Sequence, residues 1–443
     1  MIWTTNKNSK IIRLILFLHN NLKYMDGFAE FILEHENDDV AKLLLAKDRY
    51  AGVDMQLAAN TILSRRKLKS KLPSWYAEPS LIYPEKLSAE QCSSGDTAEY
   101  KARVIERLAG KGCRVADLTG GLGADTAAFS RIAEKVLYNE MNPVLADAAV
   151  HNFRILGIGN VEVCNFYVCS RSACGNDRQQ SCATVEELLG DFSPDVIFLD
   201  PARRADDGKK VFMIEDCRPD VLTLKKELLE MSGHVVIKLS PMADISMIVE
   251  RLGGVCREMH IISSAGECKE LLVVLDRDLE GECMLYASCG GNTFSFRRSE
   301  EKTARAVFPG SEGEVTGAEY IFEPNKSIMK AGSYNLMCER FGLTKLGLST
   351  HYYIAGADAD TGMLGKYGKV FIVREVLPLN NRNIKKTGAG YPKSEVTARN
   401  IRMTSDQLRT KLGVRSGDDA HIFGLRCDIM NASANYLFVT SAL

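Results

Sequence analysis

The fold is decided by one stretch of sequence, Val115-Ala116-Asp117-Leu118-Thr119-Gly120-Gly121-Leu122-Gly123-Ala124-Asp125-Thr126. An apolar strand here runs into a glycine-rich turn that opens a helix, and such glycines let a ligand approach the backbone at a helix N-terminus. Counted from Gly121 and Gly123, Thr126 stands where a dinucleotide-binding loop has its third glycine. No Lys follows the glycines, as a P-loop requires. The loop therefore disfavours NAD binding and ATP hydrolysis.

Two carboxylates accompany this loop. Asp117 ends the first strand, where it would repel a pyrophosphate and attract the ammonium group of an amino acid. Glu140 follows the second strand, where an acidic side chain can accept hydrogen bonds from both ribose hydroxyls. This pair suits S-adenosylmethionine, which has an α-amino group and a sulfonium and no phosphate. The alternative is a structural turn with two incidental acids.

Strands and helices alternate between about residues 111 and 277, which predicts a mainly parallel, doubly wound sheet. The short loop Ser264-Ala265-Gly266-Glu267 joins the last two strands and is too short for a helical crossover, so they form an antiparallel hairpin. We therefore expect an α/β, Rossmann-like, seven-stranded sheet of five parallel strands plus this hairpin. The predicted strands are Arg114–Leu118, Lys135–Asn139, Val161–Asn165, Asp195–Leu199, His234–Leu239, Glu258–Ser263 and Lys269–Asp276.

On these features, residues 85–277 resemble the class I S-adenosylmethionine-dependent methyltransferases. The resemblance implies that the first loop holds the methionine moiety, that Glu140 holds the ribose, and that Asn165 accepts a hydrogen bond from adenine in place of the usual Asp. Thr119 stands where many members have the first glycine. The cofactor-binding residues that we expect from these segments are Asp117, Thr119, Gly120, Gly121, Gly123, Asp125, Thr126, Glu140, Met141, Asn165 and Phe166.

A second motif follows the fourth strand, Leu199-Asp200-Pro201-Ala202-Arg203-Arg204. It is similar to the Asp/Asn-Pro-Pro-aromatic motif of amino-group methyltransferases, with Ala202 and Arg203 replacing the second proline and the aromatic residue. The resemblance implies that Asp200 and Pro201 hold the target amine. Arg203 can stack on a base or hold a phosphate, so we expect it in the catalytic set and Arg204 and Lys238 in substrate binding. The alternatives are an Arg pair that caps the sheet and a solvated lysine.

Upstream, Leu87-Ser88-Ala89-Glu90-Gln91-Cys92-Ser93-Ser94 precedes the helix that leads into the first strand. It resembles the segment that closes over the cofactor in RNA guanine N2-methyltransferases, which adds Gln91, Ser93 and Ser94 to the expected cofactor contacts. A helix N-cap cluster is the alternative.

The N-terminal part, residues 1–84, shows helical periodicity and predicts a small helical domain, with residues 1–24 as a possible upstream extension before Met25. Its last helix contains five positive charges between Arg65 and Lys71, next to Trp75 and Tyr76. Arg65 and Arg66 are therefore candidate RNA contacts, and a solvated helix end is the alternative.

The C-terminal part predicts two small α+β domains, a ferredoxin-like one at 278–365 and a basic one at 366–443. The first is expected to begin with strands over Cys283–Ala287 and Thr293–Arg297 and to contain a helix over Lys326–Phe341. The segment from Tyr320 to Gly332 and the tail resemble bacterial methyltransferases with a THUMP-like domain, and THUMP modules accompany many tRNA-modifying enzymes. Between Lys366 and Arg415 the net charge is +9, which favours a polyanion. Lys385 and Lys386 are the candidate substrate contacts there.

The composition of the whole chain limits which partners, metals and compartments we expect. The 443 residues carry a formal net charge of −1, so any nucleic-acid signal is local. The 13 cysteines include no CxxC pair, which indicates reduced thiols and a cytoplasmic protein. Four of them, Cys164, Cys169, Cys174 and Cys182, match no common metal spacing, so we expect no metal. No apolar run reaches the ~18 residues of a membrane helix, and we expect no secretory signal or membrane partner.

The leading hypothesis is a cytoplasmic S-adenosylmethionine-dependent RNA methyltransferase that acts on a tRNA or rRNA base, such as the exocyclic amino group of guanine. One alternative is methylation of a protein or small molecule. Another is an RNA-binding scaffold that keeps the cofactor pocket without turnover. The target base and the oligomeric state stay open at this level.

Overall fold

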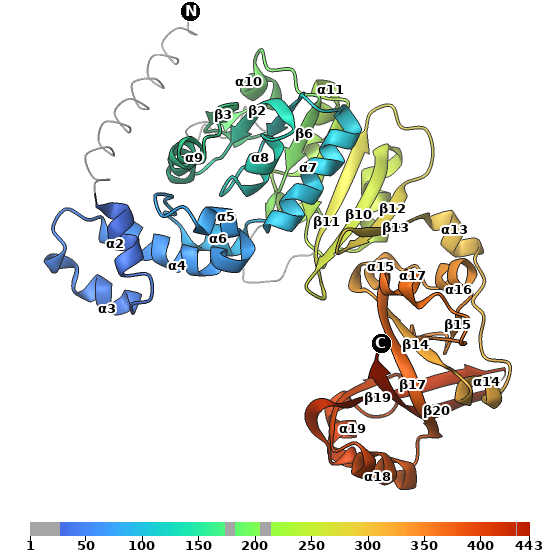
Figure 1. Cartoon of the computed structure of the whole chain (residues 1–443). Helices are drawn as coiled ribbons and strands as arrows, with labels where there is room; N and C mark the ends of the chain where they lie inside the picture. The colour runs from blue at the N-terminus through green and yellow to red at the C-terminus, as the bar shows by residue number, and fades with distance from the viewer. Residues whose placement is uncertain (1–26, 173–181, 204–213, 431) are drawn as a thin grey trace, which may run out of the picture. The chain divides into compact units, whose positions relative to one another are not determined.

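The computed structural model describes residues 27–172, 182–203, 214–430 and 432–443 (Figure 1). They form two compact units, one built mainly from residues up to 239 and the other mainly from residues 280–443. The possible N-terminal extension, Cys174 and Arg204 lie outside the described residues. Within the described residues, no helix is both long and apolar enough to cross a membrane.

The predicted seven-stranded methyltransferase sheet is confirmed, and two further strands extend it at one edge. The strand order is β13-β12-β10-β11-β9-β6-β1-β2-β3. The parallel pairs include β1 with β2 and with β6, β2 with β3, and β6 with β9. In the order of the sheet, the bounds are β13 Asn292–Arg297, β12 Met284–Cys289, β10 Cys256–Ser264, β11 Glu267–Asp276, β9 His234–Leu239, β6 Val196–Leu199, β1 Cys113–Asp117, β2 Ala133–Asn139 and β3 Val161–Cys164.

The closing hairpin is confirmed as well. Only Ala265 and Gly266 separate β10 from β11, and both have positive φ, at 52° and 78°. Such a pair is typical of a two-residue type I′ turn, whose twist matches that of the strands. Strand β11 therefore lies between β9 and β10, and a hairpin turn joins it to β10 in place of a sixth parallel crossover.

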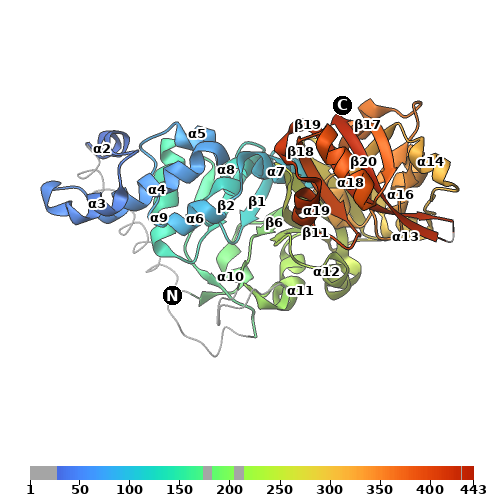
Figure 2. The same cartoon turned by 90° about the horizontal axis from the view of Figure 1, so that it is seen from below.

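Helices cover both faces of this sheet. Figure 2 shows α7 (Gly95–Ala109), α8 (Ala124–Phe129) and α9 (Pro143–Ile155) on one face, and α10 (Val185–Leu189) and α11 (Val221–Met231) on the other. Buried side chains of this unit include Tyr138 and Phe153, whose rings meet edge to face at 5.5 Å. Two short ribbons, β4–β5 (Tyr167–Val168, Cys182–Ala183) and β7–β8 (Ala202–Arg203, Cys217–Arg218), lie outside the main sheet.

The N-terminal part is helical, as predicted. Its helices are α2 (Phe28–Glu34), α3 (Val40–Leu45), α4 (Met55–Lys71), α5 (Pro73–Tyr76) and α6 (Lys86–Gln91). Phe31, Ile32, Ala58 and Ile62 form part of a separate small core there. This core results from apolar residues at helical spacing, which place one stripe of each helix inward.

The second sheet has seven strands, in the order β15-β16-β14-β17-β20-β19-β18. Their bounds are β15 Thr344–Lys345, β16 Tyr353–Ala355, β14 Tyr320–Pro324, β17 Gly368–Pro378, β20 Ala432–Ala442, β19 Arg415–Ile429 and β18 Lys393–Arg399. Helices α18 (Asn381–Gly390) and α19 (Ser405–Leu412) pack on this sheet through Ile384, Leu408 and Leu412. The remaining C-terminal helices are α13 Arg298–Thr303, α14 Glu312–Thr316, α15 Lys326–Ala331, α16 Asn335–Phe341 and α17 Thr361–Gly365.

Two C-terminal expectations need correction. The strands expected to begin a separate domain after 278 join the first sheet instead, because β12 pairs in parallel with β10 and antiparallel with β13. The helix expected over 326–341 ends at Gly332, whose φ of 76° and ψ of 24° cap α15 in the left-handed conformation, and α16 begins three residues later. Strand β17 joins the two predicted C-terminal domains, because it pairs with both β14 and β20.

The cysteines also depart from expectation in one place. Cys169 and Cys182 are joined as a disulfide between β4 and β5, so the thiols are not all free. Strand pairing explains their proximity, since Val168 lies opposite Ala183 and the two cysteines flank that pair. Within the described part of the chain, no three His, Cys, Asp or Glu side chains are grouped so that they could hold a metal ion.

Candidate active site

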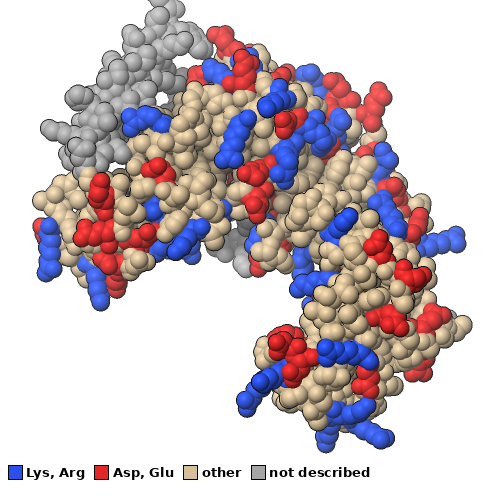
Figure 3. Space-filling view, viewed as in Figure 1, with Lys and Arg blue, Asp and Glu red and all other residues tan. Residues whose placement is uncertain are grey.

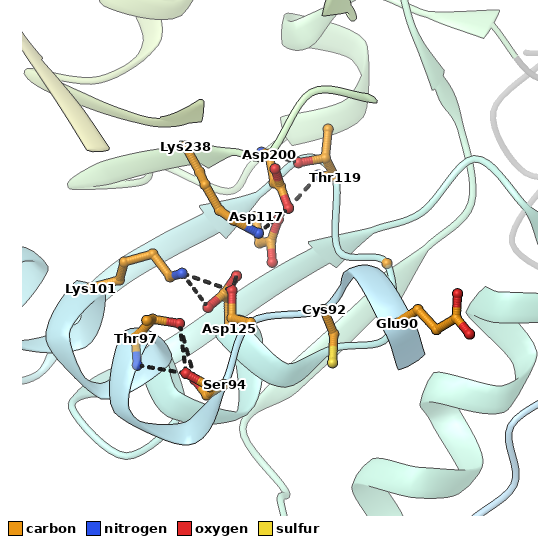
Figure 4. Close-up of polar contacts among 12 residues, drawn as sticks. Glu90, Cys92, Ser94, Thr97, Lys101, Asp117, Thr119, Asp125, Asp200 and Lys238 are labelled. Atoms are coloured by element: carbon orange, nitrogen blue, oxygen red, sulfur yellow. Dashed lines mark hydrogen bonds and ion pairs between the residues drawn. The ribbon is translucent and has the colours of Figure 1, made fainter. Parts of the chain in front are cut away.

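The acidic side chains singled out in the sequence converge at the carboxyl ends of β1, β2 and β6. Asp117 is the last residue of β1, Glu140 directly follows β2, and Asp200 directly follows β6. Because β6-β1-β2 are adjacent and parallel, their carboxyl ends lie side by side, where open α/β sheets bind their ligands. Figure 4 shows Asp117 and Asp200 close to one another, with the Lys238 side chain extending to Asp200.

Asp117 is almost completely buried, at 1% exposure. Its Oδ1 accepts a hydrogen bond from the Thr119 amide at 3.1 Å, and its Oδ2 accepts one from the Thr126 hydroxyl at 2.6 Å. Burial raises the pKa of this carboxyl from 3.8 to about 7, although the two hydrogen bonds oppose the shift. A buried carboxyl of this kind gains from a cationic neighbour, such as the ammonium group of an amino-acid ligand.

The glycine loop fits closely against Tyr138 on β2 and Phe153 on α9. A Cβ at Gly120 would lie 1.9 Å from the ring of Tyr138, and a Cβ at Gly123 would lie 2.8 Å from the ring of Phe153. Gly121 and Gly123 have positive φ, at 53° and 88°. The Tyr138 hydroxyl donates to the Gly121 carbonyl at 2.6 Å. Glycine is therefore required here for packing and for backbone conformation, and Tyr138 is a supporting residue that the motif did not reveal.

Glu140 is held by the same loop. Its Oε2 accepts from the Gly121 amide and its Oε1 from the Asn142 amide, both at 2.8 Å. Burial raises the pKa of Glu140, and these backbone hydrogen bonds oppose the shift. Each carboxylate oxygen keeps a further lone pair, so the fixed carboxylate can still accept ribose hydroxyls.

Asn165 and Phe166 follow β3 and are held by hydrogen bonds to the end of β2 and the residues after it. The Asn165 amide nitrogen donates to the carbonyls of Glu140 and Met141, at 2.6 and 3.0 Å. Its amide oxygen is then the group that can accept from an amino group. The side chain of Met141 is 61% exposed, and the Phe166 amide donates to the Asn139 side chain at 2.9 Å.

A buried ion pair supports the loop from below. Lys101 on α7 is fully buried, and its ammonium lies 3.1 Å from Asp125 Oδ1 and 2.7 Å from the Ser93 hydroxyl, which itself donates to Asp125 Oδ2 at 2.8 Å. Burial alone would raise the pKa of Asp125, but the ammonium groups of Lys101 and Lys238 and the Ser93 hydrogen bond lower it. Asp125 and Ser93 are thus bound to one another and to Lys101. Lys101 was not predicted from the sequence, although a Lys among the apolar positions of a helix indicates a buried partner.

The fourth-strand motif is tied to the same loop. The Asp200 amide donates to the Thr119 hydroxyl at 2.5 Å, and Asp200 Oδ2 lies 2.6 Å from the Lys238 ammonium. The Lys238 side chain is 12% exposed. Thr119 therefore joins the first loop to the end of β6.

Other predicted site residues lie elsewhere or are not described. Gln91 is exposed at the end of α6, and Ser94 is the N-cap of α7, accepting from the Thr97 amide at 3.4 Å. Pro201 is buried, and the backbone of Arg203 pairs with Cys217 in the β7–β8 ribbon. The Arg203 side chain lies outside the description.

The expected RNA contacts on α4 are wrong for Arg65 and lack support for Arg66. Arg65 is 2% exposed, donates to the Glu78 carbonyl at 3.1 Å and stacks on Tyr76 at 4.9 Å. Arg66 donates to the carbonyls of Glu36 and Asp38, at 2.8 and 2.5 Å. Both arginines hold helix ends and loops together, since these backbone carbonyls have no helical partner.

Comparison with solved structures agrees with this architecture. The crystal structure of a putative methyltransferase from Porphyromonas gingivalis W83 matches with 26% identity and a TM-score of 0.79, over 95% of this chain and 98% of that one. Two further structures each match 40% of this chain at 14% identity and a TM-score of 0.27. They are a putative methyltransferase from Streptococcus mutans in complex with SAH, of which 96% is covered, and an rRNA methylase from Streptococcus thermophilus, of which 93% is covered. No curated protein matches in sequence.

Family models match two C-terminal segments, a ferredoxin-like domain at residues 320–359 and a THUMP-like domain at residues 368–442. The sheet, the loop and the near full-length match define the chain as a class I S-adenosylmethionine-dependent methyltransferase. Within that class it is one that carries the ferredoxin-like and THUMP-like domains after its catalytic sheet.

Proposed function

We propose that this enzyme methylates an exocyclic amino group of a base in structured RNA. The observation that carries the proposal is the position of Asp200 and Pro201 at the end of β6, beside the loop that ends β1. An acidic side chain there can accept a hydrogen bond from an amine of the substrate. S-adenosylmethionine supplies an electrophilic methyl group on its sulfonium.

The residues of this chain fit that cofactor. The buried Asp117 carboxyl offers a partner for the ammonium of its amino-acid moiety, the glycines leave the backbone open, and Glu140 offers two fixed oxygens for the ribose. The loop has no cation for a pyrophosphate. These carboxylates and the open backbone are thus suited to a nucleoside that carries an amino acid.

Catalysis by these residues consists mainly of positioning. Asp200 orients the amine nitrogen so that its lone pair faces the methyl carbon, and it accepts a proton that the nitrogen loses when the new bond forms. Lys238 holds the Asp200 carboxylate in place through the 2.6 Å contact, and Thr119 fixes the backbone at the same residue through the 2.5 Å bond. No covalent bond to the enzyme is required.

The C-terminal unit supports RNA as the substrate. Figure 3 shows Lys and Arg side chains gathered over the end of this unit where α18 lies. Arg382, Lys385 and Lys386 are exposed on that helix, and Lys386 lies 2.8 Å from Glu375. A basic surface on a THUMP-like module is what electrostatic attraction to a phosphate backbone requires. Lys385 is the stronger of the two candidate contacts.

The test is transfer of label from methyl-labelled S-adenosylmethionine to total cellular RNA, with a pool of cellular protein in parallel. We expect wild-type protein to label RNA and Asp200→Ala to lose this activity. Asp191→Asn, an exposed acid before β6, is the matched control. Label in the protein pool alone would replace the proposal with a protein methyltransferase. Cofactor binding without label in any pool would favour an RNA-binding scaffold.

A further inference from the structure

A cavity of about 260 Å³ lies in the C-terminal unit, and Asp117, Glu140 and Asp200 are not among the residues that line it. Its walls come from the start of α12 (Ile245–Leu252), from β12 and β13, from α13 and from the end of α15. Phe296 and Leu285, 2% and 1% exposed, are among the apolar residues that line it. None of the features described so far uses this cavity.

Three cations line the cavity, namely Arg298, Lys302 and Lys330. Arg298 and Lys330 are half-buried and Lys302 is exposed. Arg298 donates from one guanidinium nitrogen to the Ser246 hydroxyl at 2.8 Å, which fixes the orientation of the fork. None of the three cations is within ion-pair distance of a carboxylate among the residues with described side chains.

The two acids that line the same cavity are bound to backbone amides. Glu301 accepts from the amides of Tyr334 and Asn335 through Oε1, and from that of Leu336 through Oε2, at 2.8 to 3.1 Å. Asp244 accepts from the Met247 amide at 2.9 Å. These carboxylates cap the first turns of α16 and α12, where the helix dipole favours them. The cations of the lining therefore stay available to an external anion.

The size and donor set select the kind of anion. Pockets for drug-sized molecules measure about 300 to 1,000 Å³, so this cavity is suited to a small group. A guanidinium fork with two ammonium groups matches the oxygens of a phosphate, which are tetrahedral and charged. We infer that this cavity binds a backbone phosphate of the RNA substrate and so anchors the RNA on the C-terminal unit. The inference rests on the proposed function for its source of phosphate.

The experiment uses the full chain and a fluorescein-labelled RNA hairpin, with binding measured by anisotropy over a series of salt concentrations. The double variant Arg298→Gln/Lys330→Gln removes two cations of the cavity. We expect affinity to fall about tenfold at low salt, as for a lost charge-assisted contact. We also expect the slope of log affinity against log salt to become shallower by about 0.7 to 0.9, the value for one phosphate contact.

The matched control is Lys326→Gln. Lys326 lies on α15, as Lys330 does, but it does not line the cavity, and its ammonium lies 3.7 Å from Glu323. We expect it to keep the wild-type slope. Lys302→Gln, a change at an exposed side chain, provides a second variant if the double variant proves unstable in a melting experiment. It should make the slope shallower in the same direction.

The inference would be overturned if the double variant and Lys302→Gln both kept the wild-type slope and affinity. In that case, RNA methylation by the wild type would show that the proposed function still holds. Inorganic phosphate is the second probe. If it binds the wild type but not the double variant, while RNA affinity is equal in both, the cavity serves a free phosphate compound and the RNA anchor is refuted. If the wild type neither binds nor methylates RNA, the proposed function itself fails.

Discussion

Cofactor affinity should depend strongly on pH through Asp117. Its carboxyl has a pKa of about 7 in the folded chain, against 3.8 for the free side chain, because it is buried. A proton on Asp117 must leave before the carboxylate can attract the ammonium of the cofactor. We therefore expect the affinity for S-adenosylhomocysteine, which keeps this ammonium, to fall about tenfold for each pH unit below 7 and to level off above it.

The same group sets the sign of a stability effect in the absence of ligand. Because the folded carboxyl holds its proton more tightly than the unfolded one, the free energy of unfolding should decrease as pH rises from about 4 to about 7. The difference of about three pKa units corresponds to roughly 4 kcal/mol, an upper estimate for a single site. Ligand binding should offset this loss, so the ligand-induced rise in melting temperature should grow over the same range.

Calorimetric titration with S-adenosylhomocysteine between pH 5.5 and 8.5, with melting curves in the same buffers, measures both effects. Asp117→Asn should bind weakly, with much less of the pH dependence. Glu140→Gln is the matched comparison, since burial raises the pKa of that carboxyl too. It should weaken binding and keep the step near pH 7. Equal wild-type affinity at pH 5.5 and pH 8 would refute the role given to Asp117.

Three further changes test the site. Lys101→Met removes the fully buried partner of an ion pair and should lower the free energy of unfolding by about 3 kcal/mol. Adding Asp125→Asn should restore part of this loss in urea titrations, and no recovery would argue against a pairwise role. Gly120→Ala places a methyl group 1.9 Å from the Tyr138 ring, so cofactor affinity and the free energy of unfolding should both fall, the latter by about 1 to 3 kcal/mol. Calorimetry measures both, and wild-type affinity would refute the packing argument. Lys238→Met should lower kcat for RNA methylation more than it lowers cofactor affinity, because it frees the Asp200 carboxylate, and equal losses would assign Lys238 to the cofactor site instead.

Much of the fold and site could be predicted because local rules act on short segments. The strand that ends at Asp117 and the turn at Gly123 follow from apolar runs and from the conformational freedom of glycine. Parallel strands then bring Asp117, Glu140 and Asp200 to one edge whatever their separation in sequence. For these three residues, strand assignment alone was enough.

The C-terminal strands were harder to assign because pairing between distant segments leaves little local signal. The residues of β12 read as an ordinary hairpin strand, and only the free edge of β10 decided that they extend the first sheet. A similar limit applied to Arg65. Its charge suggested a surface contact, but the Glu78 carbonyl and the Tyr76 ring, both later in the chain, hold it inside the helical domain.

The sequence by itself determined the class of sheet, the glycine loop and the acids at the strand ends, since each depends on near neighbours in the chain. Only the tertiary structure decided which charges neutralise one another. Lys101 meets Asp125 across two helices, and Lys238 meets Asp200 across two adjacent strands. Ion pairs form between groups that are close in space, and removal from water makes those contacts specific, so sequence spacing could not have assigned them.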